Sequence, residues 1–334
     1  MTDRLRVGLI GAGWVSRYHL IAWRALAGEA AVVAIADPNP ENAATRASEF
    51  GIETTYGSAS EMLAHGGLDA VDIAAPRAVH ADLVRLAASY GLPILCQKPL
   101  APTFAEAEAL VNEIAGKTRL MVHENWRFRA YYRQAAEWLQ AGDIGAVTAA
   151  RLTLLTSGTL ADEHGRYAAL ERQPFMRHEA RMLVAEVLIH HLDTLRMLLG
   201  PMKVTASELS RTCPDLIGED GAVIQLRARS GAAISVFASF AAHGHPAAAS
   251  DGLEILGYDG AIRLDGSILS RVGRSPLSLE YDLAETYQGS YNATITHFVD
   301  ALRANTSFET SPEDNLETVR LVEDCYRLSC RKFG

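Results

Sequence analysis

The chain has 334 residues, of which 49% are hydrophobic and 21% charged, a composition typical of folded proteins rather than disordered ones. The length suits two domains better than one. Acidic residues outnumber basic residues by 40 to 31, so the basic balance typical of nucleic-acid-binding proteins is absent. The longest apolar stretch, 182–199, carries charged residues that exclude a membrane span. Four cysteines without a CxxC pair, and no visible secretion signal, predict a cytoplasmic protein.

The first third of the chain alternates short apolar segments with helical ones. Strands are expected at 5–10, 31–36, 70–75, 93–96 and 120–123, and helices at 14–26, 41–50, 79–90 and 104–115. Thr103 and Glu106 have the spacing of a capping box for the last of these helices. Uniformly apolar strands separated by helices predict a doubly wound parallel sheet, which binds ligands at the carboxyl ends of its strands.

The remainder has a different pattern. After a helix at 130–141, residues 222–229 and 234–240 alternate apolar with polar side chains, which predicts antiparallel strands with one apolar face. Turn pairs stand at 230–231, 259–260 and 265–266, and further helices are expected at 179–199, 290–304 and 313–331.

The predicted fold class is therefore α/β in two domains. Residues 1–123 form an N-terminal Rossmann domain, and residues 124–334 form an α+β domain with an open, mainly antiparallel sheet. We expect the second domain to bind substrate, and the second face of its sheet to form a homodimer or homotetramer.

Residues 11–16, Gly-Ala-Gly-Trp-Val-Ser, match a GxGxxG fingerprint except for the serine in the third position. Gly11 permits the tight turn, and Gly13 lets the backbone approach a pyrophosphate. The free amides at the helix start, from Trp14 and Val15 onward, favour an anion there. The alternative is a glycine-rich turn without a ligand.

Asp37 narrows the choice of cofactor. It lies at the end of the second predicted strand, at the spacing expected for a carboxylate that binds the adenosine ribose hydroxyls. A carboxylate there would repel a 2′-phosphate, and residues 38–40 offer no arginine or lysine to bind one. The predicted cofactor is therefore NAD rather than NADP.

Two further segments carry candidate catalytic residues. Lys98 follows the strand at 93–96, at the sheet edge where the nicotinamide is expected; a solvated surface lysine is the alternative. In the apolar segment 182–199, Glu186, His190 and Asp193 follow i, i+4, i+7 spacing. A carboxylate one helical turn before a histidine can orient it as the base that alcohol oxidation needs. A purely structural pair explains the same spacing, and no metal site is predicted.

Together these segments resemble the glucose–fructose oxidoreductase, inositol dehydrogenase and rhizopine-catabolism (Gfo/Idh/MocA) family over nearly the whole chain. The similar segments are the glycine loop, Ala75-Pro76-Arg77 with His80, Gln97-Lys98-Pro99, Asn125-Trp126-Arg127-Phe128, the helix from Glu186 to Asp193, and residues 312–316. The resemblance implies an NAD(P)-dependent dehydrogenase or reductase of sugars, polyols or related carbohydrates.

The resemblance also implies roles for individual residues. Lys98 would polarise the reacting oxygen, His190 would accept the hydroxyl proton, and Glu186 would orient one of them. His191 points about 100° away around an α-helix, which favours His190 as the base. Contacts to the cofactor are implied for Ala75, Pro76, His80, Gln97 and Lys98, beside the glycine loop and Asp37.

Two departures from the family pattern bear on activity. Gln97 replaces glutamate, so we expect Gln97→Glu to favour protonated Lys98 and to move the pH–rate profile to higher pH. Glu186 replaces aspartate and is one methylene longer, which leaves its partner open.

The segment 162–181 is expected on the substrate side, although its arginines are balanced by acidic residues and a solvated loop explains them as well. Candidate substrate contacts are Trp126, Arg127, Arg166, Tyr167, Phe175 and His191.

Two alternatives to a net dehydrogenase stay open. One is a glycoside hydrolase that uses tightly bound NAD for a transient oxidation followed by elimination. The other is a non-catalytic sensor, against which the presence of Lys98, Glu186 and His190 argues.

Overall fold

The computed structural model describes residues 4–248 and 250–333, and the chain divides into two compact units. Unit 1 comprises Met1–Phe128 and Tyr287–Val319, and unit 2 comprises Arg129–Thr286 and Arg320–Gly334. The segment 287–319 therefore belongs with the N-terminal part, although it follows the predicted second domain in sequence. Ile295 and Phe298 explain this, because they share one buried cluster with Val7 and Trp23. The domain limits 1–123 and 124–334 remain predictions.

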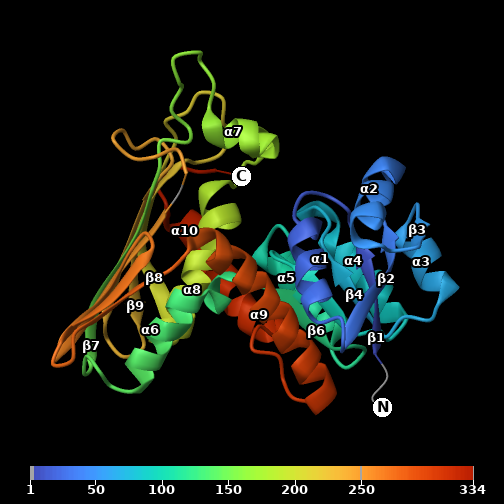
Figure 1. The fold of residues 1–334 in the computed structure, drawn as a ribbon. Coiled ribbons are helices and arrows are strands. Elements are labelled where there is room, and N and C mark those ends of the chain that lie inside the picture. The colour runs from blue at the N-terminus through green and yellow to red at the C-terminus, as the bar shows by residue number, and fades with distance from the viewer. Residues whose placement is uncertain (1–3, 249, 334) are drawn as a thin grey trace. The chain divides into compact units, whose positions relative to one another are not determined.

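Unit 1 is built on a six-stranded sheet in the order β3-β2-β1-β4-β5-β6, with all pairs parallel. Its strands are β1 (Leu5–Ile10), β2 (Ala30–Ala36), β3 (Thr54–Tyr56), β4 (Ala70–Ile73), β5 (Ile94–Gln97) and β6 (Leu120–His123). Its helices include α1 (Ser16–Ala25), α2 (Pro40–Phe50), α3 (Ala59–His65), α4 (His80–Ser89) and α5 (Phe104–Ile114), drawn in blue to teal in Figure 1. The doubly wound parallel sheet is confirmed.

Two details of unit 1 bear on the predictions. The capping box is confirmed, because Thr103 and Glu106 each accept a hydrogen bond from the other's backbone amide. The strand β3 and the helix α3 were absent from the predicted pattern. The physical reason is that β3 is a three-residue edge strand whose side chains are largely exposed, so it leaves no apolar run in the sequence.

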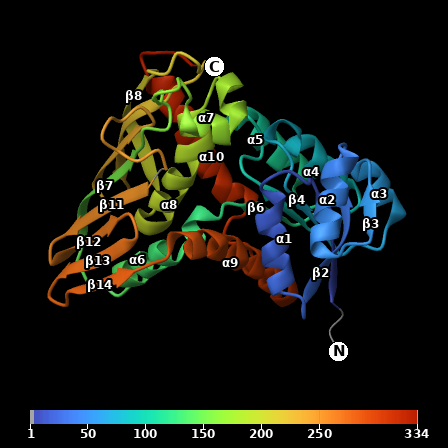
Figure 2. The same ribbon diagram turned by 45° about the horizontal axis from the view of Figure 1, so that its top comes forward.

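Unit 2 contains an eight-stranded sheet in the order β14-β13-β12-β11-β7-β10-β9-β8 (Figure 2). The strands are β7 (Val147–Leu155), β8 (Met202–Ser210), β9 (Gly221–Ala228), β10 (Ala233–Ser239), β11 (Ser250–Gly257), β12 (Gly260–Asp265), β13 (Ile268–Gly273) and β14 (Leu277–Glu280). Buried and exposed residues alternate along β9, where Ile224 is buried and Val223 is exposed, so the predicted period-two alternation is confirmed, although the exposed face also carries apolar side chains. The helices α6 (Ala130–Gln140) and α8 (Ile189–Leu199) lie on one side of this sheet (Figure 1).

The sheet of unit 2 differs from a simple antiparallel meander. The strand β7, which the sequence pattern did not reveal, lies between β10 and β11 and pairs with β10 in parallel. The other pairs described in this sheet are antiparallel. In β7, two alanines in succession, Ala149 and Ala150, are followed by Arg151. This run does not alternate between apolar and polar residues, so the sequence does not show the period of two that indicates a strand.

The predicted helix at 179–199 is wrong at its start. The α-helix α8 begins at Ile189 and is preceded by a π-helical turn at Leu183–Leu188. The amides of Met182 and Val184 donate hydrogen bonds to the carboxylate of Glu219. These bonds anchor the start of the π-helical turn to the segment just before β9. Glu186 and His190 therefore lie on different helix types, and their spacing is not that of a regular α-helix.

The remaining long helices are α9 (Leu283–Ala304) and α10 (Pro312–Leu328). No helix in the described part of the chain is long and apolar enough to cross a bilayer.

Candidate active site

The glycine loop after β1 has the geometry of a phosphate cradle. Gly11 has φ +98°, and a Cβ there would lie 2.7 Å from the carbonyl oxygen of Ala74, so only glycine fits. A Cβ on Gly13, by contrast, would meet nothing within 4 Å. One glycine thus permits the turn, and the other leaves its surface open to a ligand at the start of α1. This arrangement fits a dinucleotide pyrophosphate.

Ser16, the departure from the fingerprint, is fully buried and connects two helices. Its hydroxyl donates to the carbonyl of Gly13 at 2.6 Å and accepts from Nε of Arg46 on α2 at 3.3 Å. Arg46 also pairs with Glu49, 3.0 Å away. The serine therefore ties α2 to the phosphate loop, a contact that a third glycine would not make.

Asp37 lies at the end of β2 and holds the loop itself. Its Oδ2 accepts the amide of Ala12 at 2.7 Å, and its Oδ1 accepts the amide of Asn39 at 2.8 Å. The carboxylate is therefore fixed beside the glycine loop, where it can also receive hydroxyl donors of a ribose. Asn39 then caps α2 through its own side chain.

His80 connects the loops that follow β4 and β5. Its Nδ1 lies 2.7 Å from the carbonyl of Pro99, and its Nε2 lies 2.7 Å from the carbonyl of Ala75. The ring is 1% exposed. His80 thus links the carboxyl ends of β4 and β5, at the edge of the sheet where a cofactor is expected. Pro76 begins the 3-10 turn at Arg77–Val79 that leads into α4.

Lys98 directly follows β5, and its peptide bond to Pro99 is cis. The Gln97 side chain before it is buried, and its Nε2 lies 2.8 Å from Nε2 of His19 and 3.1 Å from Nδ1 of His123. His19 in turn contacts Asp72 on β4 at 2.8 Å. Gln97 therefore faces a buried polar cluster.

In unit 2, the π-helical turn brings Glu186 and His190 to successive turns of one helical segment. Glu186 is partly buried and His190 is 8% exposed. The start of the segment is capped by Glu219, which is fully buried and accepts the amides of Met182 and Val184 and the hydroxyl of Tyr326. Burial raises the pKa of Glu219 above the ordinary glutamate value.

His191 has a different environment from His190. It is fully buried, its Nε2 lies 2.8 Å from Asp251 Oδ1 on β11, and its Nδ1 lies 3.2 Å from the carbonyl of Val187. Both ring nitrogens therefore face acceptors inside unit 2. This favours a structural role for His191 over substrate contact, and it leaves His190 as the better candidate base.

Asp251 is the centre of that structural cluster. Besides His191 it accepts hydrogen bonds from Arg129 at 3.0 Å, Tyr131 at 3.1 Å and Tyr132 at 3.0 Å. Burial alone would raise the pKa of Asp251, but the charges of His191 and Arg129 outweigh it and hold the pKa well below its usual range. The cluster joins α6, α8 and β11.

The arginines predicted near substrate mostly have acidic partners. Arg127 is 4% exposed and donates to Asp314 at 2.7 Å within unit 1. Arg166 is exposed and pairs with Asp162 at 3.0 Å in the same loop. These contacts favour structural or solvated roles for both arginines.

The aromatic candidates are more open. The expected loop contains the short helix α7 (Ala168–Arg172) and a 3-10 turn at Pro174–His178. Phe175 lies in that 3-10 turn and is 46% exposed, and Tyr167 directly precedes α7 and is half-buried. Trp126 is half-buried in unit 1, with its ring centroid 6.1 Å from that of Tyr287. Trp14 is 60% exposed at the start of α1, where Val15 is half-buried.

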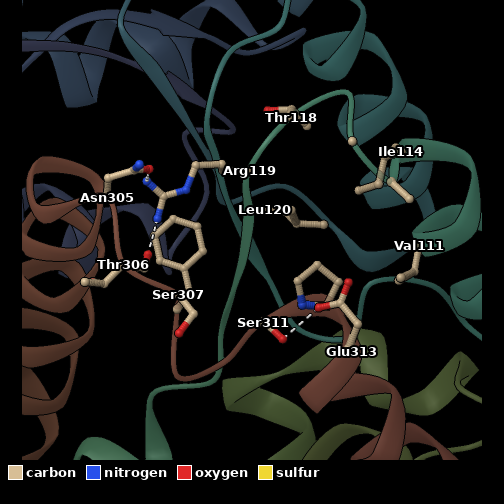
Figure 3. A pocket seen from close by; sticks show the side chains of 14 residues that line it. Val111, Ile114, Thr118, Arg119, Leu120, Asn305, Thr306, Ser307, Ser311 and Glu313 are labelled. Atoms are coloured by element: carbon tan, nitrogen blue, oxygen red, sulfur yellow. Dashed lines mark hydrogen bonds between the residues drawn. The ribbon is translucent and has the colours of Figure 1, made fainter.

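A hollow of about 340 Å³ in unit 1 does not belong to this site (Figure 3). It lies at the amino end of β6, whereas doubly wound sheets bind ligands at the carboxyl ends of their strands. Its polar groups pair with one another: Arg119 contacts Asn305 and Thr306, and Ser311 contacts Glu313.

Sequence reasoning missed several buried polar residues near the site, namely His19, Asp72, His123, Glu219 and Asp251. Asp72 gave a usable indication, because a carboxylate inside an otherwise apolar strand must find a partner. Glu219 and Asp251 gave none, since their partners come from distant parts of the chain.

Comparison with known proteins agrees with this geometry. A profile described as an oxidoreductase family with an NAD-binding Rossmann fold matches residues 5–125, and the Gfo/Idh/MocA C-terminal domain profile matches residues 132–263. D-apiose dehydrogenase of Paraburkholderia graminis is 34% identical, with 98% of this chain and 88% of that protein covered. D-apiose dehydrogenase of Rhizobium rhizogenes is 31% identical, with 98% and 95% covered.

Among solved structures, an oxidoreductase from Agrobacterium radiobacter in complex with NAD+, L-tartaric acid and magnesium is 32% identical. It superposes with a TM-score of 0.88 and covers 97% of this chain and 96% of its own. With its Rossmann sheet, its glycine loop and Asp37, the chain belongs to the Gfo/Idh/MocA family of NAD-binding oxidoreductases.

Proposed function

We propose that the protein is an NAD-dependent dehydrogenase of a sugar or polyol, which moves a hydride between a secondary hydroxyl or ketone and the nicotinamide. The observation that carries the proposal is the phosphate loop with Asp37 in a chain similar along its length to two D-apiose dehydrogenases. D-apiose is therefore the first substrate to test.

The proposed catalytic group is Lys98, Glu186 and His190. Bound NAD supplies the hydride acceptor. The Lys98 ammonium stabilises the developing alkoxide, and His190 accepts the hydroxyl proton as the carbon–hydrogen bond breaks. Glu186, earlier on the same helical segment, orients one of these two groups. Its longer side chain and the π-helical turn together set where its carboxylate reaches.

The cofactor contacts proposed are the glycine loop with Trp14 and Val15, Asp37, and the loops of Ala75, Pro76 and His80 after β4 and of Lys98 after β5. Asp37 supports NAD over NADP, since its fixed carboxylate would repel a 2′-phosphate. Of the substrate contacts considered, we retain Trp126, Tyr167 and Phe175, whose rings are at least partly exposed.

The outer face of the unit 2 sheet supports a homodimer or homotetramer. Val223, Phe237 and Leu256 are exposed there by 43%, 46% and 39%. Apolar side chains on one sheet face are a common basis for subunit contact. A cytoplasmic location is likewise proposed, in keeping with four free cysteines.

The test is a screen of NAD and NADP reduction by the purified protein with D-apiose, other sugars, polyols, sugar acids and glycosides. Lys98→Ala and His190→Ala should each lower kcat by roughly 10²–10⁴-fold, the usual contribution of a positioned acid or base. Lys117→Ala and His65→Ala, which change exposed residues of the same types, are the controls.

Turnover that survives in both Lys98→Ala and His190→Ala would refute the catalytic assignment. Glycoside cleavage without net NADH would support the hydrolase alternative. The two D-apiose dehydrogenases to which this chain is similar along its length favour net oxidation instead.

A further inference from the structure

The two residues that flank Lys98 are each held by buried histidines of unit 1. Gln97 contacts His19 and His123 through its side chain, and Pro99 contacts His80 through its carbonyl oxygen. The exposed fractions of the three imidazoles are 0% for His19 and His123 and 1% for His80.

The donors and acceptors around Gln97 can be assigned from chemistry. An amide nitrogen carries two hydrogens and accepts none, so Gln97 Nε2 donates to both imidazoles. His19 Nε2 is then an acceptor, and its Nδ1 carries the hydrogen that it donates to Asp72, 2.8 Å away. His123 accepts through Nδ1. A carboxylate on β4 thus fixes a histidine on α1, which in turn fixes an amide on β5.

The rings themselves are packed. His19 and His123 lie 4.3 Å apart between centroids, and both approach the ring of Tyr291, at 5.4 Å and 5.0 Å. Tyr291 is 3% exposed and comes from α9. This packing leaves the histidines little freedom to follow a moving Gln97 side chain.

On the other side, His80 bridges Pro99 to Ala75. The bridge ties the loop after β5 to the loop after β4. Lys98 is therefore the half-buried residue between two anchored neighbours, at the carboxyl edge of the sheet.

We propose that His19, His80 and His123 are positioning residues that fix the backbone on both sides of Lys98 and so set where its ammonium group reaches. The proposal rests on the catalytic role given to Lys98 under the proposed function. Positioning matters at this scale because a shift of about 1 Å in a reacting group can cost on the order of 10²-fold in rate.

The test separates positioning from simple stability by the choice of variants at His19. Glutamine reaches as far as Nε2 of histidine and keeps an acceptor for Gln97, whereas asparagine reaches only as far as Nδ1 and keeps the contact to Asp72. Trp23→Phe is the matched control, because Trp23 also donates to Asp72, at 2.7 Å, but does not take part in the contacts to Gln97.

Two measurements are made on each variant. Steady-state kinetics give kcat and KM for NAD and sugar, and amide hydrogen exchange of the cofactor-free protein reports on a peptide that covers residues 94–101. We expect His19→Asn to lower kcat by about 10-fold or more with KM for NAD within about 3-fold, and to speed exchange in that peptide.

His19→Gln should recover most of the lost kcat, and Trp23→Phe should lower Tm without lowering kcat beyond about 3-fold. His80→Ala should speed exchange in the same peptide. Equal losses of kcat in His19→Asn and Trp23→Phe, or unchanged exchange at 94–101 in His19→Asn and His80→Ala, would overturn the proposal. Wild-type turnover in Lys98→Ala would instead overturn the catalytic assignment while the exchange result still stood.

Discussion

Replacement of Glu219 by glutamine tests how the helical segment of Glu186 and His190 is anchored. The carboxylate accepts Val184 N–H at 2.9 Å and the Tyr326 hydroxyl at 2.5 Å on Oε1, and Met182 N–H at 3.3 Å on Oε2. Glutamine keeps the shape, but its amide nitrogen cannot accept. The lowest-cost orientation turns this nitrogen toward Met182 and leaves that amide without an acceptor.

The cost follows from the burial of the site. A buried donor left without an acceptor costs about 1–3 kcal/mol, so we expect Glu219→Gln to lower the free energy of unfolding by about 2 kcal/mol. At roughly 3 °C per kcal/mol for a unit of this size, Tm falls by roughly 6 °C. Because Glu186 and His190 lie on the anchored segment, kcat should fall as well.

The pH dependence of the stability difference between wild type and Glu219→Gln is a second measurement with an expected direction. Burial raises the pKa of Glu219, so the native state holds a proton that the unfolded state releases between the ordinary glutamate pKa and the raised value. Wild-type stability relative to Glu219→Gln therefore falls as pH rises through that window. Differential scanning calorimetry at about pH 5 and about pH 8 should show a larger Tm difference at the lower pH.

Glu323→Gln is the matched control, because Glu323 is partly exposed and pairs with Arg181 at 2.8 Å. Loss of such a surface pair costs about 0–1 kcal/mol. If Glu219→Gln were as mild as this control, the anchoring argument would be refuted. A Tm penalty that grew with pH would instead contradict the raised pKa of Glu219.

Three further predictions concern other contacts in the two units. Gly11→Ala should cost about 1–3 kcal/mol in strain at φ +98° and weaken NADH binding in a fluorescence titration; unchanged affinity would argue against the tight turn. Asp37→Ser should shift the kcat/KM ratio toward NADP by about 10-fold or more, yet lower activity with NAD, because the loop loses its anchor. Asp251→Asn leaves the buried guanidinium of Arg129 without its counter-charge and should cost about 3–5 kcal/mol at neutral pH. Because the pKa of Asp251 is lowered, this penalty should shrink only as pH falls below the ordinary aspartate range, and urea unfolding at several pH values checks it.

Much of unit 1 could be predicted because its strands and helices follow from short stretches of neighbouring residues. Apolar strands, intervening helices and the glycine loop recur at short spacing, and the resulting parallel sheet is confirmed. The exceptions are short: β3 has three largely exposed residues, and α3 has only seven residues, although it buries Met62 and Leu63. In unit 2 the hairpin turns could be predicted from the sequence. The strand β7 could not, because the strands that pair with it lie about 80 to 100 residues away in sequence.

In the candidate site, too, some residues could be predicted from local sequence and others could not. Gly11, Gly13 and Asp37 could be predicted to act together, since one turn and one strand length fix their spacing. The regular i, i+4 spacing of Glu186 and His190 was misleading, because a π-helical turn is not visible in apolar periodicity.

The sequence by itself determined the fold class and the glycine loop, and it carries the proposed preference for NAD, because each depends on neighbouring residues or on a single strand-to-helix turn. Only the tertiary structure decided which polar side chains are anchors. Gln97 meets His19 across 78 residues of sequence, and His191 meets Asp251 across 60. Buried polar groups must find partners wherever the folded chain brings them, so their pairing depends on long-range packing that no local pattern records.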